Sequence, residues 1–417
     1  MKLRLVAAAV VSMAAMGMSG CSKAPEQEAM QRPVEKPAAA ETTADAPDAD
    51  APGPQGAIAV QEARASRLKT RAGRAFYTRQ WNLDDLPAYE PKQRVSGTLR
   101  LWGSNYLSDG AVGHGWEQGF RRYHPGVRFE YYTPTVLVAA PGLASGQADI
   151  GVSRRFTFDE ILAYQRVKGH HPSRVAFATG SYNVPGWNPA LGIYVHRDNP
   201  LRQLTLQQLD GIFGAERTGG YDQNFVWRPE FARGPEKNIR TWGQLGLTGE
   251  WADKPINVYG LNLKYHQQYL IEQRAFRGGS KWNERLREYA HYTRADGSNV
   301  VANVQLLEDV SNDCYAIAYS NEGYIKPEHI VHKVALAERE GAPYVELTLD
   351  TVRDHSYPLW DEVYFYFDRK LGEPVKPIVE EYIRYALSRE GQQIVMEDGK
   401  WLPLTGGQVR RELKVLK

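Results

Sequence analysis

The chain lacks the features that mark several classes of protein. Its 417 residues include only 2 cysteines, which excludes a disulfide-rich scaffold. The 51 basic and 49 acidic residues nearly cancel, so no basic excess is present to neutralise the phosphates of a nucleic acid. With 42% hydrophobic residues, 38 glycines and 24 prolines, the composition is that of a globular protein. The length suits either two domains or one large domain with long extensions.

Motifs for catalysis are also missing. There is no Walker loop, no G-x-G-x-x-G after a strand, no G-x-S-x-G elbow and no H-E-x-x-H. The closest histidine sets, His170-His171 and His329 with His332, lack the spacing and acidic partners of a zinc site. The carboxylate pair at 380–381 shares a helical segment with basic residues, which indicates a solvated face. The sequence therefore predicts a protein that is not an enzyme and holds no metal or cofactor.

The first twenty residues are typical of an export signal. Lys2 and Arg4 precede an apolar run at 5–18, which is too short to span a bilayer. The following Met18-Ser19-Gly20-Cys21 resembles the lipobox of bacterial lipoproteins, in which the cysteine carries lipid such as palmitate and becomes residue one. We expect residues 1–20 to be a signal peptide and Cys21 to be lipidated. An ordinary secretory signal that ends near a cysteine is the alternative.

A lipid at Cys21 predicts an exported protein that is attached to a membrane of the cell envelope, on the periplasmic side. Ser22 stands where an Asp is associated with retention in the inner membrane, so the outer membrane is favoured if the source is Gram-negative. With Cys21 assigned to lipid, no intramolecular disulfide can form. Cys314 lies in the apolar run 314–319, where we expect a buried, unreactive thiol.

The residues after the lipobox predict a tether and an extension. Residues 22–60 contain eleven alanines, six prolines, many acidic residues and no aromatic residue, so 21–60 is predicted to be a disordered tether. Residues 61–95 form an N-terminal extension of intermediate composition. Its basic run is expected to be solvated, and a position on a membrane surface is the weaker interpretation. The folded part is predicted to begin at Ser96.

From Ser96 onward, strand and helix patterns alternate. Alternating or short apolar runs predict strands at 98–102, 127–131, 148–152, 190–196, 256–259 and 363–367. Helical spacing predicts helices at 116–123, 158–162, 205–213 and 375–387. Thr205 is the expected cap of the third helix, and Gly391 is the expected end of the fourth. This order predicts an α/β fold with largely parallel sheets.

Small polar residues stand where predicted strands lead into helices. These junctions are Gly103-Ser104-Asn105, Thr133-Pro134-Thr135, Ser153-Arg154 and Gly260-Leu261-Asn262. In open α/β sheets the carboxyl ends of strands lie beside helix N-termini, whose unpaired N–H groups favour anions and polar ligands. The junctions therefore predict a ligand site, although any one of them is also compatible with a simple turn.

A series of short motifs follows in a characteristic order. They are Ser96-Gly97-Thr98-Leu99 with Gly103-Ser104, Gly146 to Arg154 followed by Glu160, Asn199-Pro200-Leu201, Leu204-Thr205, Ile212-Phe213, Trp242 to Gly246, Ala316 to Tyr319, Tyr357-Pro358-Leu359, Gly391 to Val395 and Leu402-Pro403-Leu404. In this order they resemble the substrate-binding proteins of ABC transporters, and among these the phosphate-binding branch. The resemblance implies the two-lobed periplasmic-binding-protein fold (type II), with two crossing hinge strands near 191–196 and 357–367. Lobe 1 would comprise 96–192 and 358–417, and lobe 2 would comprise 193–357.

The resemblance also implies an oxyanion site, and this sequence departs from it in two loops. Ser104, Ser153 and Arg154 stand where the family places ligands. A loop expected to be rich in Gly and Ser reads 133–138 without either, and a lobe-2 loop expected to hold Arg and Ser-Gly-Thr reads 260–267. The second half of the anion cage is thus missing or rebuilt around Lys264, His266 and Gln267. The complete set of predicted ligand residues is Ser104, Asn105, Tyr106, Thr133, Thr135, Ser153, Arg154, Asn262, Lys264, His266 and Gln267.

Three functions follow from these observations. The first is a monomeric lipoprotein that closes on phosphate or a related small anion and delivers it to an ABC permease in the inner membrane. The second keeps the fold but binds another small ligand or a protein partner. The third, an exported hydrolase, is disfavoured because no nucleophile and base were found. The stretch 214–240, which is longer than the family needs, is either a lid or a surface loop, and its length favours the loop.

Overall fold

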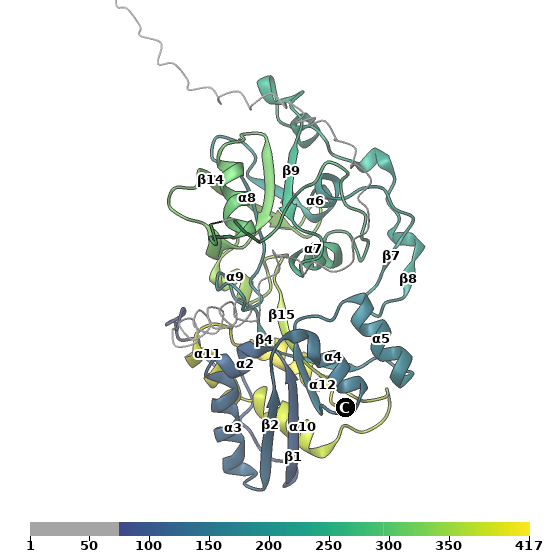
Figure 1. Cartoon of the computed structure of the whole chain (residues 1–417), viewed down its shortest axis with the longest axis vertical. Coiled ribbons are helices and arrows are strands. Elements are labelled where there is room, and N and C mark those ends of the chain that lie inside the picture. The colour runs from purple at the N-terminus through teal and green to yellow at the C-terminus, as the bar shows by residue number, and fades with distance from the viewer. Residues whose placement is uncertain (1–74, 295) are drawn as a thin grey trace, which may run out of the picture. The chain divides into compact units, whose positions relative to one another are not determined.

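The computed structural model describes residues 75–294 and 296–417 (Figure 1). The predicted signal peptide, the lipobox, the tether and the first part of the extension lie outside these described residues. None of the helices in the described ranges has the length and apolar character needed to cross a bilayer. The described chain is an α/β fold, as the sequence predicts, and two separate mixed sheets form its framework.

The first sheet has five strands in the order β2-β1-β3-β15-β4. Their bounds are β1 Gly97–Gly103, β2 Val127–Tyr132, β3 Ile150–Ser153, β4 Ser173–Thr179 and β15 Glu362–Phe367. β1 is parallel to β2 and β3, whereas β15 is antiparallel to both β3 and β4. In Figure 1 the yellow β15 lies among the blue strands, because a C-terminal segment completes a sheet that the N-terminal half begins.

Within the described ranges, seven helices accompany the first sheet. They are α2 Asn105–Asp109, α3 Val112–Tyr123, α4 Ala139–Ala144, α5 Phe158–Lys168, α10 Pro377–Ala386, α11 Arg389–Asp398 and α12 Gly406–Lys414, with a short 3-10 turn at Val136–Val138. Trp116 and Phe120 of α3 are fully buried, as their helical spacing predicts. The prediction that the last long helix runs to Gly391 is wrong. α10 ends at Ala386, and Ser388 caps a new helix by accepting the Gly391 N–H.

The second sheet has six strands in the order β10-β9-β13-β5-β14-β6. Their bounds are β5 Gly192–His196, β6 Gln203–Thr205, β9 Asn257–Leu261, β10 Arg287–Tyr289, β13 Ala316–Ser320 and β14 Val331–Ala337. The helices of this part are α6 Leu206–Phe213, α7 Gln267–Arg274, α8 Ala302–Ser311 and α9 Leu349–Arg353, and β11 Tyr292–Thr293 pairs with β12 Asn299–Val300. Thr205 caps α6 in a capping box with Gln208, which confirms the predicted cap.

The chain passes between the two sheets twice, from β4 to β5 and from α9 to β15. The two crossing segments are hydrogen-bonded to each other, since Gly180 N–H donates to the Asp361 carbonyl at 2.9 Å and Leu191 N–H to the Leu359 carbonyl at 3.1 Å. The predicted crossings at 191–196 and 357–367 correspond to these segments. The lobe boundaries at 192/193 and 357/358 stay a prediction.

The N-terminal extension is part of the folded core. The predicted start at Ser96 is too late, because Tyr77, Leu83, Leu86 and Tyr89 are all buried. The Tyr89 hydroxyl donates to the Glu381 carboxylate of α10 at 2.8 Å. Sequence reasoning missed this packing because the extension binds residues that lie about three hundred positions further along the chain.

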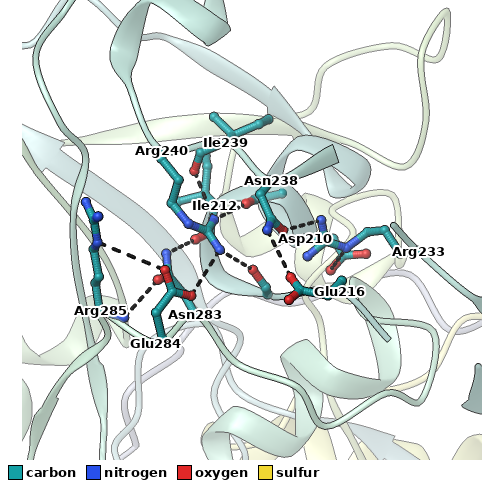
Figure 2. A network of polar contacts seen from close by, with 12 residues as sticks. Asp210, Ile212, Glu216, Arg233, Asn238, Ile239, Arg240, Asn283, Glu284 and Arg285 are labelled. Atoms are coloured by element: carbon teal, nitrogen blue, oxygen red, sulfur yellow. Dashed lines mark hydrogen bonds and ion pairs between the residues drawn. The ribbon is translucent and has the colours of Figure 1, made fainter. Parts of the chain in front are cut away.

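The insertion 214–240 is neither an irregular loop nor a separate lid. It contains the hairpin of β7 Gly220–Tyr221 and β8 Trp227–Arg228, followed by short 3-10 turns at Pro229–Phe231 and Pro235–Lys237. A polar network fixes its base to α6 and the segment 283–285 (Figure 2). At its tip, the rings of Tyr221 and Phe225 contact Phe158 of α5, with centroids 4.8 and 5.9 Å apart. The insertion therefore connects the second-sheet part of the chain with a helix of the first.

The remaining short turns complete the second-sheet part. They are the 3-10 segments Trp242–Leu245, Gly249–Trp251 and Glu322–Tyr324. Thr241 and Gln244 form a capping box at the first of them, and Gly246 ends it in the left-handed conformation that favours glycine. Trp242 is fully buried there and joins the core.

Candidate functional site

Two of the predicted ligand residues lie side by side at the end of the first sheet. The Ser104 N–H donates to the Val152 carbonyl at 2.8 Å, so the ends of β1 and β3 meet. Gly103 permits this approach, because a Cβ at its φ of +136° would lie 2.0 Å from that carbonyl oxygen. Ser104 is 2% exposed, and Ser153 is 0% exposed. The Ser153 Oγ has no hydrogen-bond partner, which leaves a buried hydroxyl for a ligand to use.

Arg154 is paired with a carboxylate of the helix that follows it, α5. Its Nη1 donates to Glu160 Oε2 at 2.8 Å and to the Arg155 carbonyl at 3.0 Å, and its Nη2 lies 3.4 Å from Glu160 Oε1. Glu160 also completes the capping box of α5 with Thr157. The charge of Arg154 is thus largely compensated within the protein, and this guanidinium holds the loop after β3 in place.

The other predicted residues of the first-sheet part lie in different surroundings. Asn105 donates through Nδ2 to Asp109 Oδ2 at 2.7 Å, within α2. The Tyr106 ring packs against Trp187, with centroids 4.3 Å apart. Thr133 Oγ1 lies 2.8 Å from Ser108 Oγ, which joins this loop to α2. Thr135 precedes the 3-10 turn 136–138, and its side chain makes no capping hydrogen bond.

The lobe-2 loop uses its backbone donors internally. The Asn262 N–H donates to the Tyr289 carbonyl at 2.8 Å, and the Tyr265 N–H donates to the Asn262 carbonyl at 2.9 Å. The Lys264 N–H donates to Asn262 Oδ1 at 3.0 Å, and the Leu263 N–H to a Glu288 carboxylate oxygen at 3.0 Å. Four consecutive N–H groups are therefore occupied, so this loop does not form an anion-binding turn.

The side chains of the predicted lobe-2 cage divide into two groups. Lys264 is exposed, and Gln267 is half-buried at the first position of α7. His266 contacts the loop after β3. Burial, and then the adjacent Arg154, hold the pKa of His266 well below its usual value, while a hydrogen bond with the Arg155 backbone acts in the opposite direction. The imidazole is therefore neutral at neutral pH, and its Nε2 has no partner. His266 therefore lies beside Arg154 and Arg155, and its part in a ligand site stays a prediction.

Several polar residues at this contact were missed by sequence reasoning. Arg155 donates through Nη2 to the Tyr364 hydroxyl at 3.1 Å, and that hydroxyl donates to Glu362 Oε2 at 2.7 Å. Arg274, at the end of α7, lies with its guanidinium carbon 3.6 Å from the centre of the Trp360 ring. The Tyr269 hydroxyl of α7 is buried and has no partner. The doublet Arg154-Arg155 was a signal for the first of these residues, but nothing in the sequence pairs α7 with the first sheet.

Two carboxyl groups on the second crossing segment face these arginines. Burial is the main cause that raises the pKa of both Asp361 and Glu362, and Arg155 and Arg274 partly oppose this shift. Neither carboxyl group lies within 4.0 Å of an arginine nitrogen among the described residues, so no direct ion pair forms.

Neither a metal site nor the large groove is found at the contact between α7 and the loop after β3. Among residues 75–294 and 296–417, no group of three or more His, Cys, Asp or Glu side chains could hold a metal ion. A groove of about 600 Å³ lies between α4 and α5 and is lined by Leu137, Ala140, Tyr164 and Val167, among others. None of the predicted ligand residues lines that groove, so we do not place the ligand there.

The chain belongs to the PBP superfamily, since residues 88–390 match the family model described as a PBP superfamily domain. Within it, the chain belongs to the phosphate-binding branch. Phosphate-binding protein PstS of Pseudomonas aeruginosa strain PAO1 and that of strain UCBPP-PA14 are each 31% identical over 333 residues, which is 79% of this chain and 90% of each relative. The family predicted from the sequence motifs is thereby confirmed.

Solved structures that the chain resembles have a lower sequence identity to it. PstS from Borrelia burgdorferi is 16% identical, with 74% of this chain and 100% of that chain covered and a TM-score of 0.46. An ABC-type phosphate transport receptor from Vibrio cholerae is 17% identical, with 73% and 99% covered and a TM-score of 0.43. The family assignment does not depend on these two structures.

Proposed function

We propose that this protein captures inorganic phosphate between its two sheets and delivers it to the permease of an ABC transporter. The support is the family and the relatives named as phosphate-binding proteins. The observation that carries the proposal is the Ser153 hydroxyl, which is fully buried without a partner at the end of β3. A buried hydroxyl that lacks a partner costs free energy, and a phosphate oxygen would restore its hydrogen bond.

Closure about the crossing segments is the mechanism that we infer. The two segments that join the sheets are bonded to each other, so they form a narrow connection about which the two parts can move. Phosphate that contacts both parts binds the closed form better than the open form, and it therefore shifts the population towards closure. The closed form is the one that a permease would recognise.

The residues that we propose to contact phosphate from the first sheet are Ser104 and Ser153, with Arg154 behind them. His266 belongs to the same place. Lys264, Gln267, Asn262, Thr133 and Thr135 stay predictions for the rim of the site. We further propose that Cys21 carries the lipid that attaches this monomeric protein to the periplasmic side of the cell envelope. Mass spectrometry of the N-terminal peptide would show the added acyl groups, and an unmodified Cys21 would contradict the anchor.

Calorimetric titration tests the capture of phosphate. The protein is purified in mild detergent, unfolded and refolded to remove carried ligand, and titrated with phosphate and then with sulfate. We expect micromolar or tighter phosphate binding with no response to sulfate. A cooperatively folded sample that responds to neither anion would refute the proposal.

One observation favours a second function for the same fold. Because the four N–H groups of 262–265 already have acceptors, the lobe-2 half of the anion site expected for the family is not preorganised to bind an anion. A protein of this kind would bind another small ligand or a protein partner from the cell envelope. With this second function, the gene of the protein is not expected beside genes for a permease and an ATPase. The transport function predicts that both of those genes are adjacent to it.

A further inference from the structure

Hydrogen-bond donors without acceptors gather where α7 meets the end of the first sheet. Ser153 Oγ and Tyr269 Oη are buried without partners, and the two residues are 0% and 9% exposed. The guanidinium groups of Arg155 and Arg274 have no carboxylate oxygen within 4.0 Å among the described residues. Such a set of donors lacks what a small oxyanion supplies, namely several acceptor atoms and negative charge.

We propose that Arg155 and Arg274, together with Tyr269, form the charged part of the oxyanion site in this protein. The donors from the lobe-2 side then come from the body of α7 and not from the loop 262–267 that precedes it. This inference rests on the proposed capture of phosphate and names the residues of this chain that would hold the anion.

Arg155 approaches from the first sheet. Ser153 and Tyr364 are opposite each other on β3 and β15, so their side chains share one face of the sheet, and Arg155 donates to that tyrosine hydroxyl. Its remaining N–H groups are unassigned to any acceptor among the described residues. The Arg155 side chain is half-buried, so it is within reach of a ligand from solvent.

Arg274 approaches from α7 with a fixed orientation. Its guanidinium stacks on one Trp360 ring at 3.6 Å, and His355 lies parallel to the same indole with ring centroids 3.6 Å apart. A guanidinium held on an aromatic ring keeps its in-plane N–H groups free for a planar, two-point contact with an oxyanion. Arg155 and Arg274 are close enough for their charges to repel, since the charge of Arg155 lowers the pKa of Arg274 after the larger effect of burial. A bound anion between them would relieve that repulsion.

The nearby carboxyl groups form no direct ion pair with Arg155 or Arg274 among the described residues. Asp361 and Glu362 have raised pKa values because they are buried, and neither touches an arginine. Glu362 accepts the Tyr364 hydroxyl, and Asp361 accepts the Asn188 amide at 3.3 Å and the N–H of Glu362 at 2.9 Å. Their positions stabilise the crossing segment and leave the guanidinium groups available. A small anion of at least two negative charges matches this pair.

Titration of variants with inorganic phosphate tests the inference. Arg274→Gln and Arg155→Gln each remove one guanidinium, so we expect each to weaken phosphate binding tenfold or more, since hydrogen bonds to charged groups contribute strongly. Arg274→Lys keeps the charge but loses the forked contact, so an intermediate loss is expected. Tyr269→Phe keeps the packing and removes only the hydroxyl, and a smaller loss is expected.

The matched control is Arg277→Gln. Arg277 lies three residues after Arg274, is exposed, and packs on Phe231. Its replacement by glutamine changes the net charge by the same amount as Arg274→Gln but leaves the proposed site intact. We expect its phosphate affinity to stay within twofold of the wild type. Thermal unfolding of each variant identifies any that fail to fold, and Tyr269→Phe with Arg274→Lys then carry the test.

The outcomes separate this inference from the proposed function. A wild-type protein that binds neither phosphate nor sulfate overturns both. A wild-type protein that binds phosphate, with Arg274→Gln and Arg155→Gln within twofold of it, overturns the inference alone. If Lys264→Gln loses affinity while Arg274→Gln does not, the loop and not α7 supplies the lobe-2 contact, and the inference is again wrong.

Discussion

Arg154 and Arg155 are neighbours in the sequence but have different partners. Arg154 is paired with Glu160, whereas the Arg155 side chain has, among the described residues, the Tyr364 hydroxyl as its one hydrogen-bond partner. A charge that is already paired offers little to an incoming anion, while a charge without a direct counter-ion gains a partner on binding. Arg154 stands at the position of the family ligand but is already paired with a carboxylate. Arg155, its neighbour, has no carboxylate partner among the described residues.

Glu412 gives a test of the electrostatics around the first sheet. Burial, and then the nearby Glu362 carboxylate, raise the pKa of Glu412 to about 7 from a usual 4.5. As the pH rises from about 4.5 to about 7, the unfolded chain releases a proton that the folded protein keeps, so this residue lowers stability over that interval. The neutral Glu412→Gln variant avoids this loss and retains an oxygen for the Ala176 N–H, which Glu412 accepts at 2.7 Å.

Urea unfolding at pH 4.5 and pH 8 measures the effect of that change. Relative to the wild type, Glu412→Gln is expected to gain about 2 kcal/mol of unfolding free energy between the lower and the higher pH. Carboxylates other than Glu412 and its neighbour Glu362 titrate equally in both proteins, so the comparison reports on this buried pair. A difference that is the same at both pH values would show that Glu412 titrates normally.

At the level of single residues, the sequence predicted local contacts well and distant ones poorly. The positions of Ser104 and Ser153 at strand ends and the cap at Thr205 follow from turn chemistry and capping rules within a few residues. The contact between His266 and the loop after β3 came from the family resemblance. Arg274 was missed because its role depends on how α7 docks onto Trp360, which no local pattern encodes.

At the scale of elements, the insertion 214–240 depends on one buried carboxylate. Asp210 of α6 accepts two hydrogen bonds from Arg217, at 2.8 and 2.7 Å, and lies 3.3 Å from Arg233 Nε. Asn238 links Arg233 to Glu216, and Arg240 donates to the Gly211 carbonyl at 2.7 Å (Figure 2). Two buried guanidinium groups thus share one counter-ion, and the base of the insertion is held rigidly to α6.

Asp210→Asn tests this attachment. Removal of one partner of a buried ion pair leaves an uncompensated charge, so we expect a loss of about 3 to 5 kcal/mol in unfolding free energy. Glu284→Gln is the matched control, because Glu284 is 65% exposed and its contact with Arg240 is 3.4 Å long. That variant should lose less than about 1 kcal/mol. Equal, small losses in denaturant unfolding for the two variants would contradict the role assigned to Asp210.

Element prediction also shows where sequence patterns stop being informative. The alternation of strands and helices from Ser96 to the C-terminus predicted the α/β fold, because each pattern reflects a face buried against its own sheet. The extension 75–95 has no such periodicity, since it is held by single contacts such as Tyr89 to Glu381 and Tyr77 to Asn183. The insertion 214–240 was expected to be a loop because its composition, rich in glycine and arginine, has no strand pattern. Its two strands, β7 and β8, have only two residues each, and its buried ion pair with Asp210 leaves no local signal.

At the scale of the whole described chain, the two sheets are linked by two crossing segments, which are hydrogen-bonded to each other, and by the contact at α7. The donors that we assign to phosphate come from both sides of that contact, Ser153 and Arg155 from the first sheet and Tyr269 and Arg274 from α7. An anion that bonds to both sides can stabilise closure, whereas one that bonds to a single side cannot. The insertion adds a second link between the two parts through the rings of Tyr221 and Phe225.

A crystal structure of the protein grown with saturating phosphate is the most direct test of the central claim. We predict a tetrahedral anion within hydrogen-bond distance of Ser153 Oγ, with guanidinium nitrogens of Arg155 and Arg274 on its other oxygens. Phosphate bound elsewhere in the protein, or a contact between α7 and the first sheet that holds no anion, would contradict the account.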